Sequence, residues 1–157
     1  MARKFGEKRE ICIDPLAYNI GLIGESGIGK STVIKEVCEK LVGDDGYIAL
    51  DIGKEDGHDA INGIVSAKIP DWATFKEFCD DVIENKLTDY KDLRVIVLDT
   101  FDQLLEITEP EVIRMHNRAN PDKPKITSIK AAFGGFMAGE DKAIQLVLDK
   151  LWELKAV

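Results

Sequence analysis

The sequence predicts a three-layer α/β sandwich built on a mainly parallel β-sheet. Short apolar runs alternate along the chain with longer amphipathic stretches, as strands and helices do in such folds. Residues 95–98 form a continuous apolar run before Asp99, which is typical of a strand buried on both faces in a parallel sheet. The length of 157 residues and the lack of repeats suit one unit, so we expect a single domain over residues 1–157.

The first half of the chain predicts strands and a helix around a glycine-rich turn. Residues 18–23 predict a strand, and residues 10–13 a shorter one before it. Residues 31–41 predict a helix because apolar side chains recur at helical spacing, and Gly43 suits its C-terminal end. Residues 47–50 predict the next strand, followed by a loop rich in Gly, Asp and Glu.

The second half predicts two further helices, on either side of the strand at 95–98. Asp71 suits the N-cap of a helix that runs to about residue 87, with an apolar stripe for core packing. Residues 109–125 contain three prolines and are expected to form an exposed, flexible excursion. Residues 138–155 predict a final helix whose buried stripe is expected to be Ile144, Val147, Leu148, Leu151 and Trp152.

The composition argues against several classes of protein. The formal charge of −8 opposes strong direct binding to nucleic acid. No apolar run approaches the ~20 residues that span a bilayer, and no apolar segment follows the basic N-terminus as in a signal peptide, so we expect a cytoplasmic protein with no membrane partner. The three cysteines are widely spaced, which indicates reduced thiols.

Residues 24–31, Gly-Glu-Ser-Gly-Ile-Gly-Lys-Ser, carry the strongest functional signal. They fit the pattern G-x-x-x-x-G-K-[ST] and lie between a predicted strand and a predicted helix. Such glycines let the backbone curl so that successive N–H groups, together with the positive end of a helix dipole, hold a polyphosphate. We therefore expect ATP or ADP and Mg²⁺ as cofactors. The expected nucleotide-binding residues are Gly24, Glu25, Ser26, Gly27, Ile28, Gly29, Lys30, Ser31 and Thr32.

Three residues are assigned chemistry at this site. Lys30 is expected to reach the β and γ phosphates as a catalytic residue, and the Ser31 hydroxyl to ligate the magnesium ion. Asp99, at the end of the apolar run, is the expected carboxylate on the metal side. Thr100 follows it, where many AAA-type ATPases have a Glu that polarises the attacking water, so the base must come from elsewhere.

These residues resemble the RecA-like P-loop ATPases of phages and prophages, a group of AAA-domain proteins linked to single-strand annealing and recombination. The likeness covers residues 18–155 and includes the loop, the strand end at Asp51, residues 95–104 and the glycine-rich residues 132–140. It implies a Mg²⁺-dependent ATPase that forms a homo-oligomer in its full-length form. Single-stranded DNA and recombination proteins are the partners that it implies.

The resemblance also guides the choice of the catalytic base. RecA-like ATPases place the base at the end of the second strand, where this chain reads Asp-Ile-Gly-Lys-Glu-Asp at residues 51–56. Glu55 is our candidate, with Asp51 and Asp56 as alternatives. A solvated acidic loop is an equally weighted interpretation, because the position of the family's usual Glu falls on Gly53.

The chain departs from the group at its end. There the final helix leads into another central strand whose polar tip senses the γ phosphate, whereas this sequence stops at Val157. We expect a chain truncated before its last core strand, with residues 10–13 or a strand from a second copy as the alternative that fills this place. Truncation would remove the sensor and impair catalysis more than binding.

Two other functions stay open. A small nucleotide or metabolite kinase uses the same loop and would need an arginine lid, for which residues 114–118 are the candidate. A nucleotide-dependent binding or assembly module would hydrolyse little. His58 and His116 are interpreted as surface or loop histidines, since no partner lies at ligand spacing.

Overall fold

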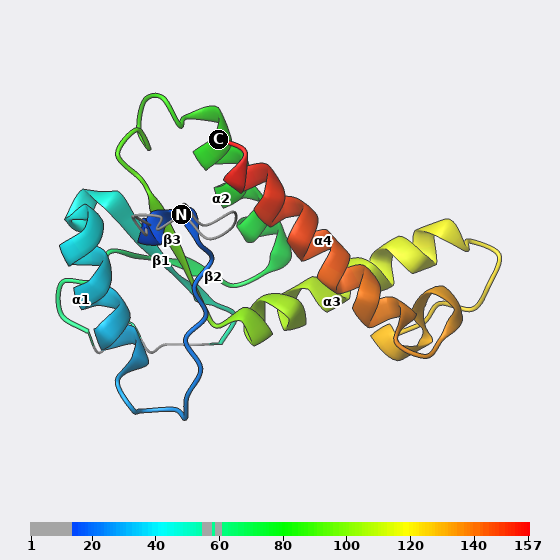
Figure 1. Ribbon diagram of the computed structural model, residues 1–157. Coiled ribbons are helices and arrows are strands. Elements are labelled where there is room, and N and C mark those ends of the chain that lie inside the picture. The colour runs from blue at the N-terminus through cyan, green and yellow to red at the C-terminus, as the bar shows by residue number, and fades with distance from the viewer. Residues whose placement is uncertain (1–13, 55–57, 59–60) are drawn as a thin grey trace, which may run out of the picture.

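The computed structural model of the protein describes residues 14–54, 58 and 61–157. Within these residues a parallel three-stranded sheet has the order β2-β1-β3 (Figure 1). The strands are β1 (Tyr47–Ile52), β2 (Ser66–Ile69) and β3 (Val95–Asp99). The predicted α/β class with a parallel sheet is confirmed, although the sequence did not indicate β2.

Helices cover both faces of this sheet (Figure 1). On one side lies α1, and on the other lie α2 and α4, while α3 leaves the end of β3 and packs along α4. Short 3-10 helices precede α1, β1 and α4: η1 (Pro15–Ala17), η2 (Asp44–Gly46) and η4 (Ile129–Gly134). The helices are α1 (Lys30–Val42), α2 (Trp72–Glu84), α3 (Phe101–Ala119) and α4 (Ala138–Lys155).

The main core lies between the sheet and α2. Leu50 and Ile52 of β1 pack there against Phe75 and Cys79 of α2, and all four side chains are fully buried. Burial raises the pKa of Cys79 to about 12, so this thiol is neutral and unreactive in the folded protein. The cysteine in the core is therefore a packing residue.

The predicted N-cap of α2 is confirmed. The carboxylate of Asp71 accepts hydrogen bonds from the backbone N–H of Thr74 at 2.8 Å and from its hydroxyl at 2.9 Å. These bonds favour the ionised carboxylate and lower the pKa of Asp71. The helix that begins here ends at Glu84, three residues before its expected end at about residue 87.

The predicted strand at residues 18–23 is wrong. This segment runs as an extended blue chain toward the loop before α1 and is paired with none of the described strands (Figure 1). Ile20 and Ile23 are 74% and 98% exposed. A strand forms only where a neighbour supplies hydrogen bonds, and apolar alternation alone does not supply them. The short strand expected at residues 10–13 lies outside the described residues.

Two expectations about burial and order are also wrong: that the strand at 95–98 is buried on both faces, and that residues 109–119 are an irregular excursion. Residues 121–125 are exposed and lie outside helices and strands, as expected. Among the described residues β3 pairs with β1 on one side only, and its five residues are half-buried instead of buried on both faces. The expected excursion at 109–125 is helical as far as Ala119, with Pro110 inside α3, because Val112 is fully buried against Ile129 and Ala132. Packing against η4 thus outweighs the helix-breaking tendency of proline.

The bounds of α4 are confirmed, but its expected buried stripe is only partly correct. Val147 is buried, whereas Ile144, Leu148 and Trp152 are 38%, 43% and 63% exposed. Small residues, Gly139 and Ala143, are buried instead. They allow α4 to approach η4 closely.

Gly139 permits that approach, so its replacement by alanine should destabilise the fold. An added Cβ would lie 2.1 Å from the carbonyl oxygen of Ile129 and 2.8 Å from its side chain. We expect Gly139→Ala to lower the free energy of unfolding by about 1–3 kcal/mol, measured as a lower urea midpoint. In the control Gly21→Ala the added Cβ meets nothing within 4 Å, and the midpoint should stay unchanged. Equal midpoints for both variants would refute this packing.

Candidate functional site

Residues 24–31 form an exposed turn that leads into α1. Gly27 and Gly29 have φ values of 79° and 91°, in the left-handed region that favours glycine. Gly29 is the N-cap of α1, and no side chain in the described part of the protein caps this helix end. The first-turn N–H groups are therefore available to an anion, which the positive end of the helix dipole also attracts.

The ammonium group of Lys30 lies over this turn. Its Nζ donates hydrogen bonds to the carbonyl oxygens of Gly24, at 2.8 Å, and Glu25, at 2.7 Å. These bonds hold a positive charge inside the curl of the backbone. A bound phosphate would compete for the ammonium with two neutral carbonyls, and a charged acceptor makes the stronger hydrogen bond.

Ser31 connects the turn to the carboxyl end of the sheet. Its hydroxyl donates to Oδ2 of Asp99, the last residue of β3, at 2.7 Å. Hydroxyl and carboxylate oxygens are ligands that Mg²⁺ accepts, usually with waters and phosphate oxygens completing its octahedron. The two side chains therefore fit a magnesium ion, and they lie where the loop meets the strand end.

Two buried polar residues lie beside Asp99. His58 is 3% exposed, and its Nε2 is 2.9 Å from Asp99 Oδ2, so the expectation of a surface position is wrong, although His58 does lie in the segment that connects β1 to β2. Asp51 is also 3% exposed and stands opposite Asp99 in the register of β1 and β3. His58 follows the end of β1, and Asp99 ends β3. Because the carboxyl ends of parallel strands meet at one edge of the sheet, these two positions were the sequence signal that the side chains lie close together.

Comparison with known protein families matches residues 16–139, more than half of the chain, to the AAA domain. The chain belongs to the AAA domain family. Neither the curated proteins nor the solved structures contain a match to it. The matched residues include the loop at 24–31, β1 and β3. An AAA domain is a P-loop NTPase domain that binds ATP, typically with Mg²⁺, so nucleotide binding is the function that the family assigns.

The structure of this AAA domain describes only some of the candidate catalytic bases. Glu55 and Asp56 lie outside the described residues. Gly53, where the resemblance places the family's usual Glu, has a φ of 70°, and an added Cβ would lie 2.6 Å from Oε1 of Gln103. The left-handed backbone therefore disfavours a glutamate at this position, whereas the flexible end of the Gln103 side chain can move aside.

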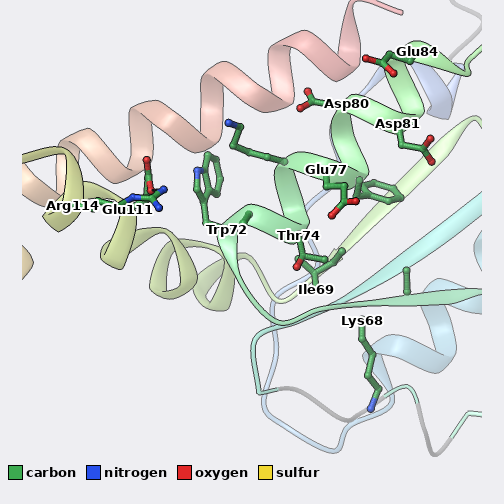
Figure 2. A pocket seen from close by; sticks show the side chains of 14 residues that line it. Lys68, Ile69, Trp72, Thr74, Glu77, Asp80, Asp81, Glu84, Glu111 and Arg114 are labelled. Atoms are coloured by element: carbon green, nitrogen blue, oxygen red, sulfur yellow. Dashed lines mark hydrogen bonds and ion pairs between the residues drawn. The ribbon is translucent and has the colours of Figure 1, made fainter. Parts of the chain in front are cut away.

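Neither residues 24–31 nor Asp99 lines a second feature of the AAA domain, a groove whose lining side chains are shown in Figure 2. Carboxylates line it along α2, and Arg114 of α3 reaches it in an ion pair with Glu111. Five acidic side chains and three basic ones line the groove, so it suits an anionic nucleotide less well than the loop does.

No helix of the described part is long and apolar enough to cross a membrane.

Proposed function

We propose that this AAA domain binds ATP and Mg²⁺ at residues 24–31 and hydrolyses the bond between the β and γ phosphates. The observation that carries the proposal is the 2.7 Å contact between the Ser31 hydroxyl and the Asp99 carboxylate. It brings a pair of oxygen ligands to the mouth of a loop that already holds a lysine ammonium. Charge, backbone donors and metal ligands thus converge on the place where a triphosphate would lie.

Each group has a distinct part in the proposed reaction. The backbone N–H groups of the loop and the start of α1 bind and orient the phosphates. Lys30 offsets negative charge that develops on the phosphate oxygens, while Ser31 and Asp99 would hold the ion. When bound, Mg²⁺ supplies charge neutralisation of the β and γ phosphates. A carboxylate then has to accept the proton of the attacking water, and we propose Glu55 for it.

Replacing Glu55 with glutamine tests this base. We expect Glu55→Gln to lower the rate of phosphate release by about 100-fold or more, since general-base catalysis contributes at least that much. The affinity for ATP should stay unchanged, because glutamine preserves size and removes only the proton acceptor. Asp56→Asn serves as the control and should retain turnover. Wild-type turnover in the Glu55 variant would eliminate this residue as the base.

We further propose that the ATPase serves DNA recombination or annealing, as a homo-oligomer that works with single-stranded DNA or recombination proteins. The resemblance of residues 95–104 and 132–140 to the phage and prophage group supports this, whereas the net charge of −8 favours protein partners over direct contact with DNA. The kinase alternative loses support because Arg114 of the expected lid pairs with Glu111 in the groove away from the loop.

One set of measurements separates the three functions. Phosphate release is followed with Mg²⁺-ATP alone and after addition of single-stranded DNA, and small acceptors are assayed for phosphoryl transfer. Stimulation by DNA would support a recombination ATPase, and transfer to an acceptor would establish a kinase. Binding of ATP analogues without either activity would leave a nucleotide-dependent assembly module.

A further inference from the structure

His58 is a buried polar side chain that the proposed reaction does not use. Its side chain is 2% exposed, and its Nε2 lies 2.9 Å from Oδ2 of Asp99. Its second ring nitrogen, Nδ1, is buried and has no hydrogen-bond partner among the residues that the structure describes. Carboxylate oxygens accept hydrogen bonds, so Nε2 is the donor in the tautomer that makes this contact.

The hydrogen bond of His58 converges with that of Ser31. Both donors reach the same oxygen, Oδ2 of Asp99, one from α1 and one from the segment after β1. Two donors from different elements restrict rotation of the carboxylate. A hydroxyl that becomes a metal ligand is drawn toward the ion, and His58 then remains as the donor that holds the carboxylate.

We propose that His58 is a positioning residue that orients the Asp99 carboxylate for Mg²⁺. This inference rests on the proposed function, since it gives Asp99 the metal-side role. Loss of a group that hydrogen-bonds to a metal ligand commonly lowers metal affinity about 10–100-fold, and we expect an effect of this size when His58 is replaced. His58 contacts Asp99 at the end of β3 and not the loop. Loss of this contact should therefore lower the affinity for Mg²⁺ and leave the affinity for nucleotide in the absence of Mg²⁺ unchanged.

Three variants separate positioning from packing. His58→Gln keeps an N–H donor at a similar reach, His58→Leu keeps volume without a donor, and His58→Asn keeps polarity but is too short to reach Asp99. The measured quantities are the affinity for a fluorescent ATP analogue in EDTA, the Mg²⁺ concentration that gives half-maximal enhancement of binding, and the urea midpoint of the ligand-free protein.

The Mg²⁺ concentration for half-maximal enhancement of binding should rise about tenfold in His58→Leu and His58→Asn. In His58→Gln it should rise by about threefold or less. Analogue affinity in EDTA should stay within about twofold of wild type in all three, a readout that a packing defect would move. If Leu fails to fold, the comparison of Asn with Gln still decides. Equal Mg²⁺ requirements in wild type, Asn and Gln, or equal losses in Asn and Gln, would overturn positioning by His58. A wild-type protein whose analogue binding ignores Mg²⁺ would instead overturn the proposed function.

Discussion

Lys30→Ala should weaken ATP binding by about 100-fold, equivalent to about 2.7 kcal/mol. The ammonium is the positive side chain inside the loop, held by the carbonyl oxygens of Gly24 and Glu25 at 2.8 and 2.7 Å. Removing it leaves the phosphates with the neutral backbone donors of the loop and the proposed Mg²⁺, and charged hydrogen bonds are about twice as strong as neutral ones. Titration with ATP and GTP analogues in the presence of Mg²⁺ measures the loss and the base preference together.

The control for this variant is Lys40→Ala. Lys40 is an exposed lysine in the last turn of the same helix, so its removal changes the net charge equally without touching the loop. Its affinity for ATP should match that of wild type. The urea midpoint of Lys30→Ala should also match, because both partners of its ammonium are exposed loop carbonyls. Unaltered ATP affinity in Lys30→Ala would refute the assignment of the loop.

Asp99→Asn should abolish the Mg²⁺ dependence of nucleotide binding and lower phosphate release by about 1000-fold. Asparagine keeps the shape of the side chain but removes the charge that faces the ion, and a metal ion contributes several kcal/mol to stabilising transition-state charge. In EDTA the variant should bind ATP at least as tightly as wild type, since a carboxylate next to a triphosphate repels it. Binding titrations with and without Mg²⁺ separate these two effects.

Asp102→Asn is the matched control for Asp99. Asp102 lies in the first turn of α3, three residues further along the chain, and is exposed. Its replacement removes the same charge close to the strand end but outside the contact with Ser31. We expect wild-type Mg²⁺ dependence for it. If Asp99→Asn also retained that dependence, the ion would have to be held by other residues.

Features set by neighbouring residues were well predicted from the sequence. The helical spacing of apolar residues identified α1, and Gly43 was correctly placed at its C-terminal end. Asp71 was correctly identified as an N-cap, and its carboxylate accepts a hydrogen bond from the residue three positions ahead. The bounds of α4 agree with its amphipathic pattern. These features depend on hydrogen bonds and side chains within a few residues, and local sequence encodes them directly.

Features that depend on distant partners were predicted less well. Residues 18–23 have the apolar alternation of a strand, but pairing requires an adjacent backbone, and none of the described strands pairs with them. Pro110 indicated a break, yet α3 continues because Val112 packs against residues of η4 that follow in the sequence. Neither outcome can be read from the segment itself, since long-range contacts decide both.

The candidate site shows the same division. By itself the sequence determined the chemistry: a glycine-rich turn whose backbone can hold phosphates, a lysine at the start of a helix, and an aspartate at the end of an apolar run. Only the tertiary structure decided which side chains meet. It joined Ser31 to Asp99, 68 positions apart, and buried His58 against the same carboxylate. The physical reason is that parallel strands bring their carboxyl ends to one edge, which places His58, after β1, next to Asp99 at the end of β3, while the start of α1 brings Ser31 to the same oxygen.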